Sequence, residues 1–411
     1  LFILGLSYNA PKYTQSRIPV PKGSVFIIVE DMASGPLMYE SMLLKPQHQK
    51  ALADFTAYPN LVAPGVLTKI TLPRIFSGDN INALTLEKMI GQGKERSIFA
   101  STPNLKSTIV LNNGFPDWYC DTQGVKCLNL EFEYDKFFRH VYEIDEMMAV
   151  LLIKIMPVAF DFTPLLPQLR SLVPLDESRG RSLTFDNFSM LEPLESAPPE
   201  LFVFYSHVTH ISYNYADADC NYVHEGYNSL THHLCGVTIV SRLAERLKQM
   251  GVYDSSTIAV LSDHGPSISS IRLPAYINKL SMPLYNYFKP GQYHRELSVV
   301  PNEIHRLIPV MMIKYPDAHH EDMEFDFRPA YTLDMVPTIC RLKGWCGNKV
   351  FDGLPLTESA ASFKGRKRKV YNLPIKQLCY PDHDACFTQL NATAEFDERL
   401  DLVTYPNTTQ K

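Results

Sequence analysis

The stretch Leu261-Ser262-Asp263-His264-Gly265-Pro266 decides how the rest of the sequence is interpreted. It continues the apolar run at residues 256–260 (Ser-Thr-Ile-Ala-Val), which is bounded by turn-forming residues and is typical of a buried strand. A carboxylate and an imidazole therefore stand where a strand ends, and α/β sheets bind ligands at that end. Aspartate and neutral histidine hold zinc at about 2.0–2.2 Å. An aspartate cap beside a turn histidine is the ordinary alternative, so the stretch needs partners elsewhere.

Two other apolar runs also end in polar side chains. Residues 24–29 (Ser-Val-Phe-Ile-Ile-Val) precede Glu30-Asp31, and residues 201–205 (Leu-Phe-Val-Phe-Tyr) precede His207 and His210. The carboxyl ends of parallel strands lie at one edge of a sheet. We therefore expect carboxylates and imidazoles to converge there, which is the chemistry of a divalent metal site.

The remaining pattern alternates strands with helices. Helical spacing of apolar residues from 227 to 250 predicts a helix just before the Asp263 strand, and residues 65–78 predict the opening of another that Gly78 ends. Further predicted elements are strands at 106–111 and 308–313, a late helix at 331–342, a loop at 55–64 and an irregular excursion at 164–199. This alternation predicts an α/β fold with a mostly parallel central sheet flanked by helices on both faces.

Composition excludes some classes of function. The chain has 411 residues, 45% of them hydrophobic, and a formal net charge of -5 with mixed signs, which gives no indication of nucleic-acid binding. The longest apolar run, Met147 to Phe160, is too short to span a membrane and contains Lys154. The basic run Lys364–Lys369 is typical of a solvated loop, and contact with acidic glycans or membrane phosphates is its alternative. The chain lacks an initiator methionine, so it starts after processing or is a fragment.

Cysteines and glycosylation sequons predict an oxidising, secretory compartment. The eight cysteines fall largely in close pairs, namely Cys120/Cys127, Cys340/Cys346 and Cys379/Cys386, with Cys220 and Cys235 left over. Their connectivity cannot be deduced from sequence. Sequons begin at Asn187, Asn391 and Asn407. We therefore expect a secreted, extracellular glycoprotein.

Taken together, these segments resemble the alkaline phosphatase and sulfatase superfamily. More narrowly, they are similar to the sulfatase-like family of unknown function in nematode and insect secreted proteins. The resemblance is carried by Ile-Ile-Val-Glu30-Asp31, Thr68 through Ser77-Gly78, Ser262-Asp263-His264-Gly265, Glu303 through Val310, and Asn372 through Cys386. It covers most of residues 24–390 in order. It implies an α/β domain over residues 1–370 and a small, disulfide-stapled C-terminal region over 371–411.

The resemblance also implies roles for individual residues. Glu30 would be a metal ligand, with Asp31 beside it as a second, and both would act with Asp263 and His264 on one or two divalent ions. Zinc is expected, with calcium as the alternative. The superfamily's nucleophile, which also contacts metal, commonly lies ten positions before the glycine of a Thr-Gly or Ser-Gly pair. Counting back from Gly78 gives Thr68.

Two points stay open at this stage. Thr71 is the alternative nucleophile, because some members place their threonine two residues before a proline and Pro73 fits that spacing. Two-metal members have an aspartate four residues before a histidine on the third strand, and Ser206 takes that place relative to His210. The second site is therefore incomplete, or it is formed by His207, His210 and His294.

Sulfatases of this superfamily carry a cysteine in Cys-x-Pro-x-Arg, and the corresponding segment here has threonines and no cysteine. A threonine suits phosphoryl transfer. We therefore expect a metal-dependent phosphoesterase or phosphotransferase that acts on a small-molecule, glycan or lipid phosphoester, with His210 as second-metal ligand or as an aid to the leaving group. The alternative is a catalytically silent extracellular glycoprotein that uses the fold as a scaffold. Whether the chain is an enzyme, and whether it forms a homo-oligomer or filament, is left open.

Overall fold

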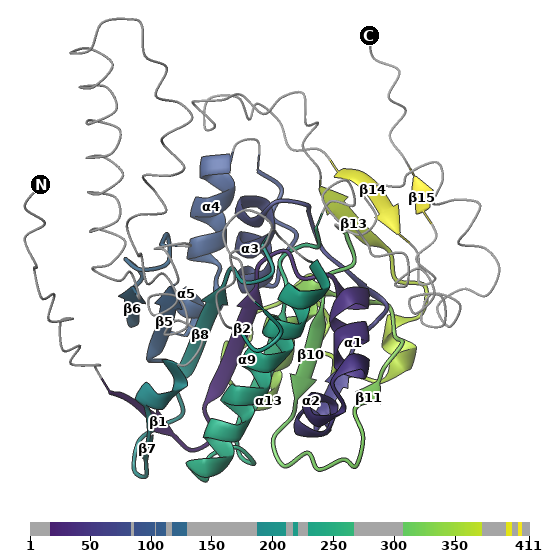
Figure 1. Ribbon diagram of the computed structural model, residues 1–411. Helices are drawn as coiled ribbons and strands as arrows, with labels where there is room; N and C mark the ends of the chain where they lie inside the picture. The colour runs from purple at the N-terminus through teal and green to yellow at the C-terminus, as the bar shows by residue number, and fades with distance from the viewer. Residues whose placement is uncertain are drawn as a thin grey trace, which may run out of the picture.

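The computed structural model describes residues 17–83, 86–102, 104–111, 117–129, 187–210, 217–220, 229–266, 307–371, 392–396 and 402–404. Within these residues an eight-stranded sheet of order β11-β3-β10-β9-β2-β8-β5-β6 forms the centre (Figure 1). Its strands are β2 (Val25–Glu30), β3 (Phe55–Ala57), β5 (Ser107–Leu111), β6 (Val125–Asn129), β8 (Leu201–Ser206), β9 (Thr257–Leu261), β10 (Met311–Lys314) and β11 (Glu324–Phe325).

The sheet is mixed. β2 pairs in parallel with β8 and β9, β8 with β5, and β5 with β6, so the predicted parallel arrangement holds around β2. β10 runs antiparallel to both of its neighbours, β9 and β3. β10 is antiparallel because the chain enters it at the carboxyl end of β9. Its first residue, Met311, pairs with Leu261, the last residue of β9, so β10 runs back along β9 from that end. The α/β class is confirmed. Five of the seven strand pairs in this sheet are parallel, and the two pairs that β10 makes are antiparallel.

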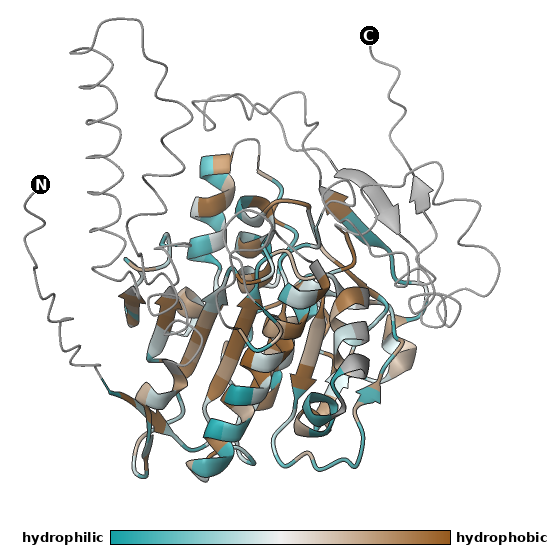
Figure 2. Cartoon of the chain, in the orientation of Figure 1, coloured by the Kyte–Doolittle hydropathy of each residue, from teal (hydrophilic) through white to brown (hydrophobic). Residues whose placement is uncertain are grey.

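Helices cover both faces of the sheet. α1 (Gly35–Leu44), α2 (Pro46–Ala51) and α9 (Ser229–Gln249) lie on one face, and α3 (Thr68–Ser77), α4 (Leu86–Glu95), α5 (Ile98–Ser101) and α13 (Met335–Lys343) belong to the other. Side chains of a strand alternate between faces. On β2, Phe26 and Ile28 pack toward α9, whereas Val25, Ile27 and Val29 pack toward α3 and α13. The central strands are accordingly apolar along their length (Figure 2). None of the described helices is long and apolar enough to cross a membrane.

Two predicted irregular segments contain strands. Residues 55–64 hold β3 and β4 (Leu61–Val62), and β4 pairs with β12 (Ala330–Tyr331). The loop prediction was wrong because strands of two or three residues are too short to show a period, and pairing with distant strands decides their conformation. Within 164–199, a 3-10 turn (Asn187–Met190) leads into β7 (Leu191–Leu194), which pairs with β1 (Ile18–Pro21). Residues 147–160 lie outside the described residues.

Three disulfides lie within the described residues, and they join Cys120 to Cys127, Cys220 to Cys235 and Cys340 to Cys346. Cys379, Cys386, Asn391 and Asn407 lie outside them. β13 (Arg368–Tyr371) pairs with β14 (Ala392–Phe396), and β14 pairs with β15 (Leu402–Thr404). A three-stranded sheet therefore spans the predicted boundary at residue 370, and the two-region division stays a prediction.

The basic run at residues 364–369, which overlaps the start of β13, is partly buried. Arg366 makes two bonds to the Asp334 carboxylate, at 2.6 and 2.7 Å, and the Asp334 side chain is fully buried. Arg368 is also fully buried and donates to the carbonyl oxygens of Asn60 and Ala330. The solvated-loop prediction is therefore wrong for these two arginines. Arg368 joins β13 to β12 and to the residue before β4, and Arg366 joins the run to Asp334, the residue before α13. The three lysines of the run are exposed.

We expect Arg366→Met to lower the free energy of unfolding by about 3 kcal/mol, because it leaves the buried Asp334 carboxylate without its cation. Lys367→Met is the matched control, since Lys367 is exposed and adjacent. Urea denaturation followed by circular dichroism measures both. Equal midpoints for the two variants would show that the ion pair does not hold β13 in place.

Candidate metal site

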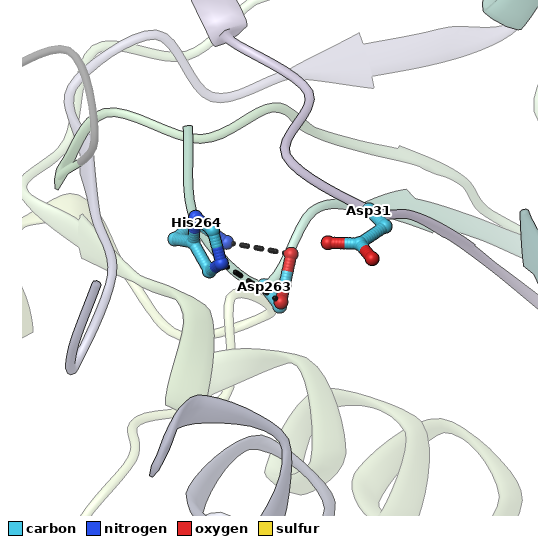
Figure 3. Close-up of side chains that lie close together, drawn as sticks. All are labelled: Asp31, Asp263 and His264. Atoms are coloured by element: carbon cyan, nitrogen blue, oxygen red, sulfur yellow. Dashed lines mark hydrogen bonds and ion pairs between the residues drawn. The ribbon is translucent and has the colours of Figure 1, made fainter. Parts of the chain in front are cut away.

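Asp31, Asp263 and His264 meet at the carboxyl ends of β2 and β9 (Figure 3). All three are buried, and one ligand atom from each lies within 4.8 Å of the other two. The register of the sheet explains the meeting. Val29 pairs with Leu261, so the residues two positions further on, Asp31 and Asp263, emerge opposite each other and on the same face.

The loop after Asp31 is bonded to the loop after β9. The Met32 amide donates to Asp263 Oδ1 at 3.2 Å, and the Ala33 amide donates to Ser262 Oγ at 2.9 Å. Met32 adopts a left-handed conformation with φ of 61°, which is uncommon for a residue with a side chain. These bonds fix the two carboxylates relative to each other.

Asp263 and His264 each present one atom that could bind a cation. Asp263 Oδ1 also accepts from the His264 amide at 2.9 Å, whereas no donor in the described part of the chain makes a hydrogen bond to the buried Oδ2. His264 Nδ1 lies 2.9 Å from the Gly265 carbonyl oxygen, so Nδ1 carries the proton and Nε2 offers its lone pair. Nε2 lies 3.4 Å from Asp263 Oδ2. A carboxylate oxygen without a donor among the described residues, beside an unprotonated imidazole nitrogen, fits a divalent cation.

The electrostatics of the two carboxylates differ. Burial raises the pKa of Asp263, with the negative charge of Asp31 adding to the shift and His264 opposing it. Burial would also raise the pKa of Asp31, but the bond from His207 and the neighbouring imidazoles hold that pKa below its usual range. His207 Nδ1 lies 3.0 Å from Asp31 Oδ2. The surroundings therefore favour the ionised form of Asp31 more strongly than that of Asp263.

Thr68 lies beside this group. It is the first residue of α3, and its Oγ1 is 3.4 Å from Asp31 Oδ1 and 3.5 Å from His264 Nε2. Thr71 is buried one turn further on, and its hydroxyl donates to the Leu67 carbonyl oxygen at 2.9 Å. The predicted helix ends at Gly78, which has φ of 70°. Of the two threonines, the structure brings Thr68 to the ligand group and engages Thr71 with its own helix.

Glu30 lies on the opposite face of the sheet. It is the last residue of β2 and is fully buried, and its carboxyl carbon lies 3.6 Å from where a Cβ would stand on Gly236 of α9. No donor among the described residues makes a hydrogen bond to either oxygen. Burial raises the pKa of Glu30 to about 8, with the Ser206 hydroxyl opposing and Asp31 adding. Glu30 is not in the three-residue ligand group.

The other predicted histidines are spread more widely. The His207 ring lies 6.2 Å from the half-buried His210 ring. Burial lowers the pKa of His210, and Asp31 opposes that shift. His294 lies outside the described residues. The described residues therefore form one three-ligand group, with His207 bonded to one of its ligands.

One residue at the site was not predicted. Tyr205 is buried, and its ring packs edge to face against the His207 ring, with centroids 4.8 Å apart. A sequence signal existed, because Tyr205 lies two positions before His207 and the two-residue period of a strand puts both side chains on one face.

Comparison with known proteins shows the fold. No protein-family model and no curated protein matches this sequence. Ps i-CgsB is 12% identical, with 86% of this chain and 80% of that chain covered and a TM-score of 0.50. A protein in the alkaline phosphatase superfamily from Vibrio parahaemolyticus is 11% identical, with 87% of this chain and 74% of that chain covered and a TM-score of 0.44. The phosphonate monoester hydrolase of Agrobacterium radiobacter is 12% identical, with 92% of this chain and 91% of that chain covered and a TM-score of 0.49.

At these identities the likeness is one of fold. The α/β fold of this chain is similar to that of Ps i-CgsB. The resemblance to the narrower sulfatase-like family of nematode and insect proteins stays a prediction.

We expect Asp31→Asn to weaken zinc binding by at least about 100-fold, because it removes a charged donor from the group. Glu30→Gln should change the zinc dissociation constant by less than about threefold, because Glu30 faces α9. Competition with a chromogenic chelator measures both. The reverse order of effects would mean that Glu30, and not Asp31, holds the ion.

Proposed function

We propose that this chain is a secreted, metal-dependent phosphoesterase or phosphotransferase that acts through Thr68. The observation that carries the proposal is the position of the Thr68 hydroxyl, which contacts both Asp31 and His264 at the edge of the sheet. A hydroxyl at the start of a helix and beside a cation-binding group is placed to act as a nucleophile.

The ligand set favours zinc over calcium. Asp31, Asp263 and His264 would hold the ion, and calcium prefers sites built from oxygen atoms alone. When bound, zinc supplies positive charge that lowers the pKa of a nearby hydroxyl and stabilises charge on the phosphoryl group. The chain itself provides the orientation: the Met32 and His264 amides fix Asp263, His207 fixes Asp31, and the Gly265 carbonyl fixes the His264 ring.

The reaction would run in two steps. In the first, a bond forms between Thr68 Oγ and phosphorus as the bond from phosphorus to the ester oxygen breaks, and the leaving alkoxide takes up the proton that Thr68 releases. In the second, water or an acceptor alcohol displaces the phosphoryl group and restores the Thr68 hydroxyl. His210, whose pKa is lowered by burial, would assist the leaving group in the first step by passing it the proton that Thr68 releases.

The proposed compartment and substrate class are supported by features outside the ligand group. Three disulfides and three sequons favour an oxidising, extracellular setting, in which the substrate would be a small-molecule, glycan or lipid phosphoester. The second candidate function is a catalytically silent extracellular scaffold. Its support is that Glu30 faces α9 and that Ser206 stands where two-metal members have an aspartate.

We expect Thr68→Ala to lower turnover of bis-(p-nitrophenyl) phosphate by at least about a thousandfold with zinc present, because the nucleophile is lost. Thr71→Ala is the matched control and should stay within a few-fold of the wild type. Mass spectrometry of the acid-quenched wild type should find phosphothreonine at residue 68.

Two results would contradict this proposal. Equal loss in both variants would mean that the α3 segment has been disturbed rather than a nucleophile removed. A wild type that binds zinc, hydrolyses neither phosphate nor sulfate esters and carries no phosphothreonine would favour the scaffold.

A further inference from the structure

Ser262 is a buried polar residue between β9 and the two ligands that follow it, and its hydroxyl has no part in the chemistry proposed above. The side chain is fully buried. Because side chains alternate along a strand, Ser262 takes the same face as Val260, which packs in the apolar core on the α9 side of the sheet. A hydrophobic residue would fill that position as well. The hydroxyl therefore calls for an explanation of its own.

The Ser262 hydroxyl bonds the loop after β2 to the loop after β9. The Ala33 amide donates to Ser262 Oγ at 2.9 Å, and the hydroxyl donates to the His264 carbonyl oxygen at 2.6 Å. Asp263 Oδ1 is farther from Oγ, at 3.3 Å. The hydroxyl has a single proton, so the shorter bond to the His264 carbonyl takes it.

Ala33, Ser262 and Val310 form a closed ring of three hydrogen bonds. The Ala33 amide donates to Ser262 Oγ, the Ser262 amide to the Val310 carbonyl at 2.9 Å, and the Val310 amide to the Ala33 carbonyl at 3.3 Å. All three residues are fully buried. Two of these bonds join backbone groups, which every residue but proline provides. The third needs a side-chain oxygen at position 262, so the ring depends on that residue being a serine.

The ring adjoins the residues of the candidate metal site. Ala33 follows Asp31 by two positions. Ser262 directly precedes Asp263 and His264. Asp31 and Asp263 lie at the ends of separate strands, so their spacing depends on how the two loops are joined. With alanine at 262, the buried Ala33 amide would lose its acceptor, which is unfavourable, and the loops would shift to restore a bond.

We propose that Ser262 is a positioning residue for the metal site: its hydroxyl joins the loop that carries Asp31 to the loop that carries Asp263 and His264, and so sets the ligands in place before a cation binds. This inference rests on the zinc site of the proposed function and adds a residue to it. Ligands that are already in place bind an ion more tightly, because less of the binding free energy is spent on ordering the chain.

The test is Ser262→Ala, which removes only the hydroxyl oxygen. We expect the dissociation constant for zinc, measured by competition with a chromogenic chelator, to rise about 10- to 100-fold, as for other residues that orient a metal ligand. The matched control is Ser256→Ala, just before the other end of β9. Ser256 is also fully buried, and its hydroxyl donates to the Val252 carbonyl oxygen at 2.7 Å. The control should bind zinc as tightly as the wild type.

Cobalt(II) in place of zinc separates positioning from a general loss of stability, because its visible absorption depends on the arrangement of its ligands. Ser262→Ala should shift the cobalt absorption bands, whereas Ser256→Ala should keep the wild-type spectrum, with the folding of both variants checked by circular dichroism. Unchanged zinc affinity in Ser262→Ala would overturn the inference. So would an equal loss of affinity in the two variants, which would mean that any buried hydroxyl of this strand matters as much.

A further measurement does not depend on the variant folding. In a crystal structure of the wild type with zinc bound, Ser262 Oγ should lie within about 3.2 Å of both the Ala33 nitrogen and the His264 carbonyl oxygen. A ring that zinc binding opens, or a Ser262 that binds zinc itself, would overturn the positioning role.

The outcomes also separate this inference from the proposed function. A wild type that binds zinc without hydrolysing esters, beside a Ser262→Ala variant with weakened zinc binding, overturns the proposed function and supports the role of Ser262. An active wild type with an equally tight Ser262→Ala variant overturns only that role. A wild type that does not bind zinc overturns both.

Discussion

The parallel register of β2 with its two neighbours is the constraint on which the site depends. The pairs Val29–Leu261 and Val29–Tyr205 set offsets that carry Asp31 to Asp263 on one side and to His207 on the other. A shift of one residue along either ladder would turn these side chains to opposite faces of the sheet. Phe26 and Phe202 stack across β2 and β8 with ring centroids 5.2 Å apart, which helps to fix the register in the core.

The loop beyond β2 shows what this arrangement costs and how the cost is offset. Met32 takes a left-handed backbone conformation, which costs roughly 1–2 kcal/mol for a residue with a side chain. Each amide that follows Asp31 finds a partner: Asp263 for Met32, Ser262 for Ala33, and His233 Nε2 for Ser34 at 3.0 Å. These bonds come from β9 and α9. The loop is therefore held by elements on two sides, and the strained conformation persists because its surroundings determine it.

The sequence predicted more of the fold than of the site. Long apolar runs and helical spacing located β2, β8, β9, α3 and α9, because such elements carry their own period. The choice between Glu30 and Asp31 could not be made in this way. All six residues of β2 are buried, so the strand shows no alternation from which to tell which face each side chain takes. Which of Thr68 and Thr71 stands at the start of α3 depends on where the helix begins, and helix boundaries are the least certain part of a sequence prediction.

The adjacent acids Glu30 and Asp31 show how this alternation distributes charge. Glu30 faces α9, where Gly236 has no side chain and leaves room for the carboxyl group, and burial raises its pKa to about 8. Asp31 faces α3, where His207 and the other imidazoles favour its ionised form. Two neighbouring carboxyl groups are thus in opposite states near pH 7, one neutral and one charged, because their environments shift their pKa values apart. A cation is attracted to the charged one. The direction in which each side chain leaves the strand therefore determines which of the two acids lies beside Asp263 and His264, and that direction is a property of the sheet rather than of either residue.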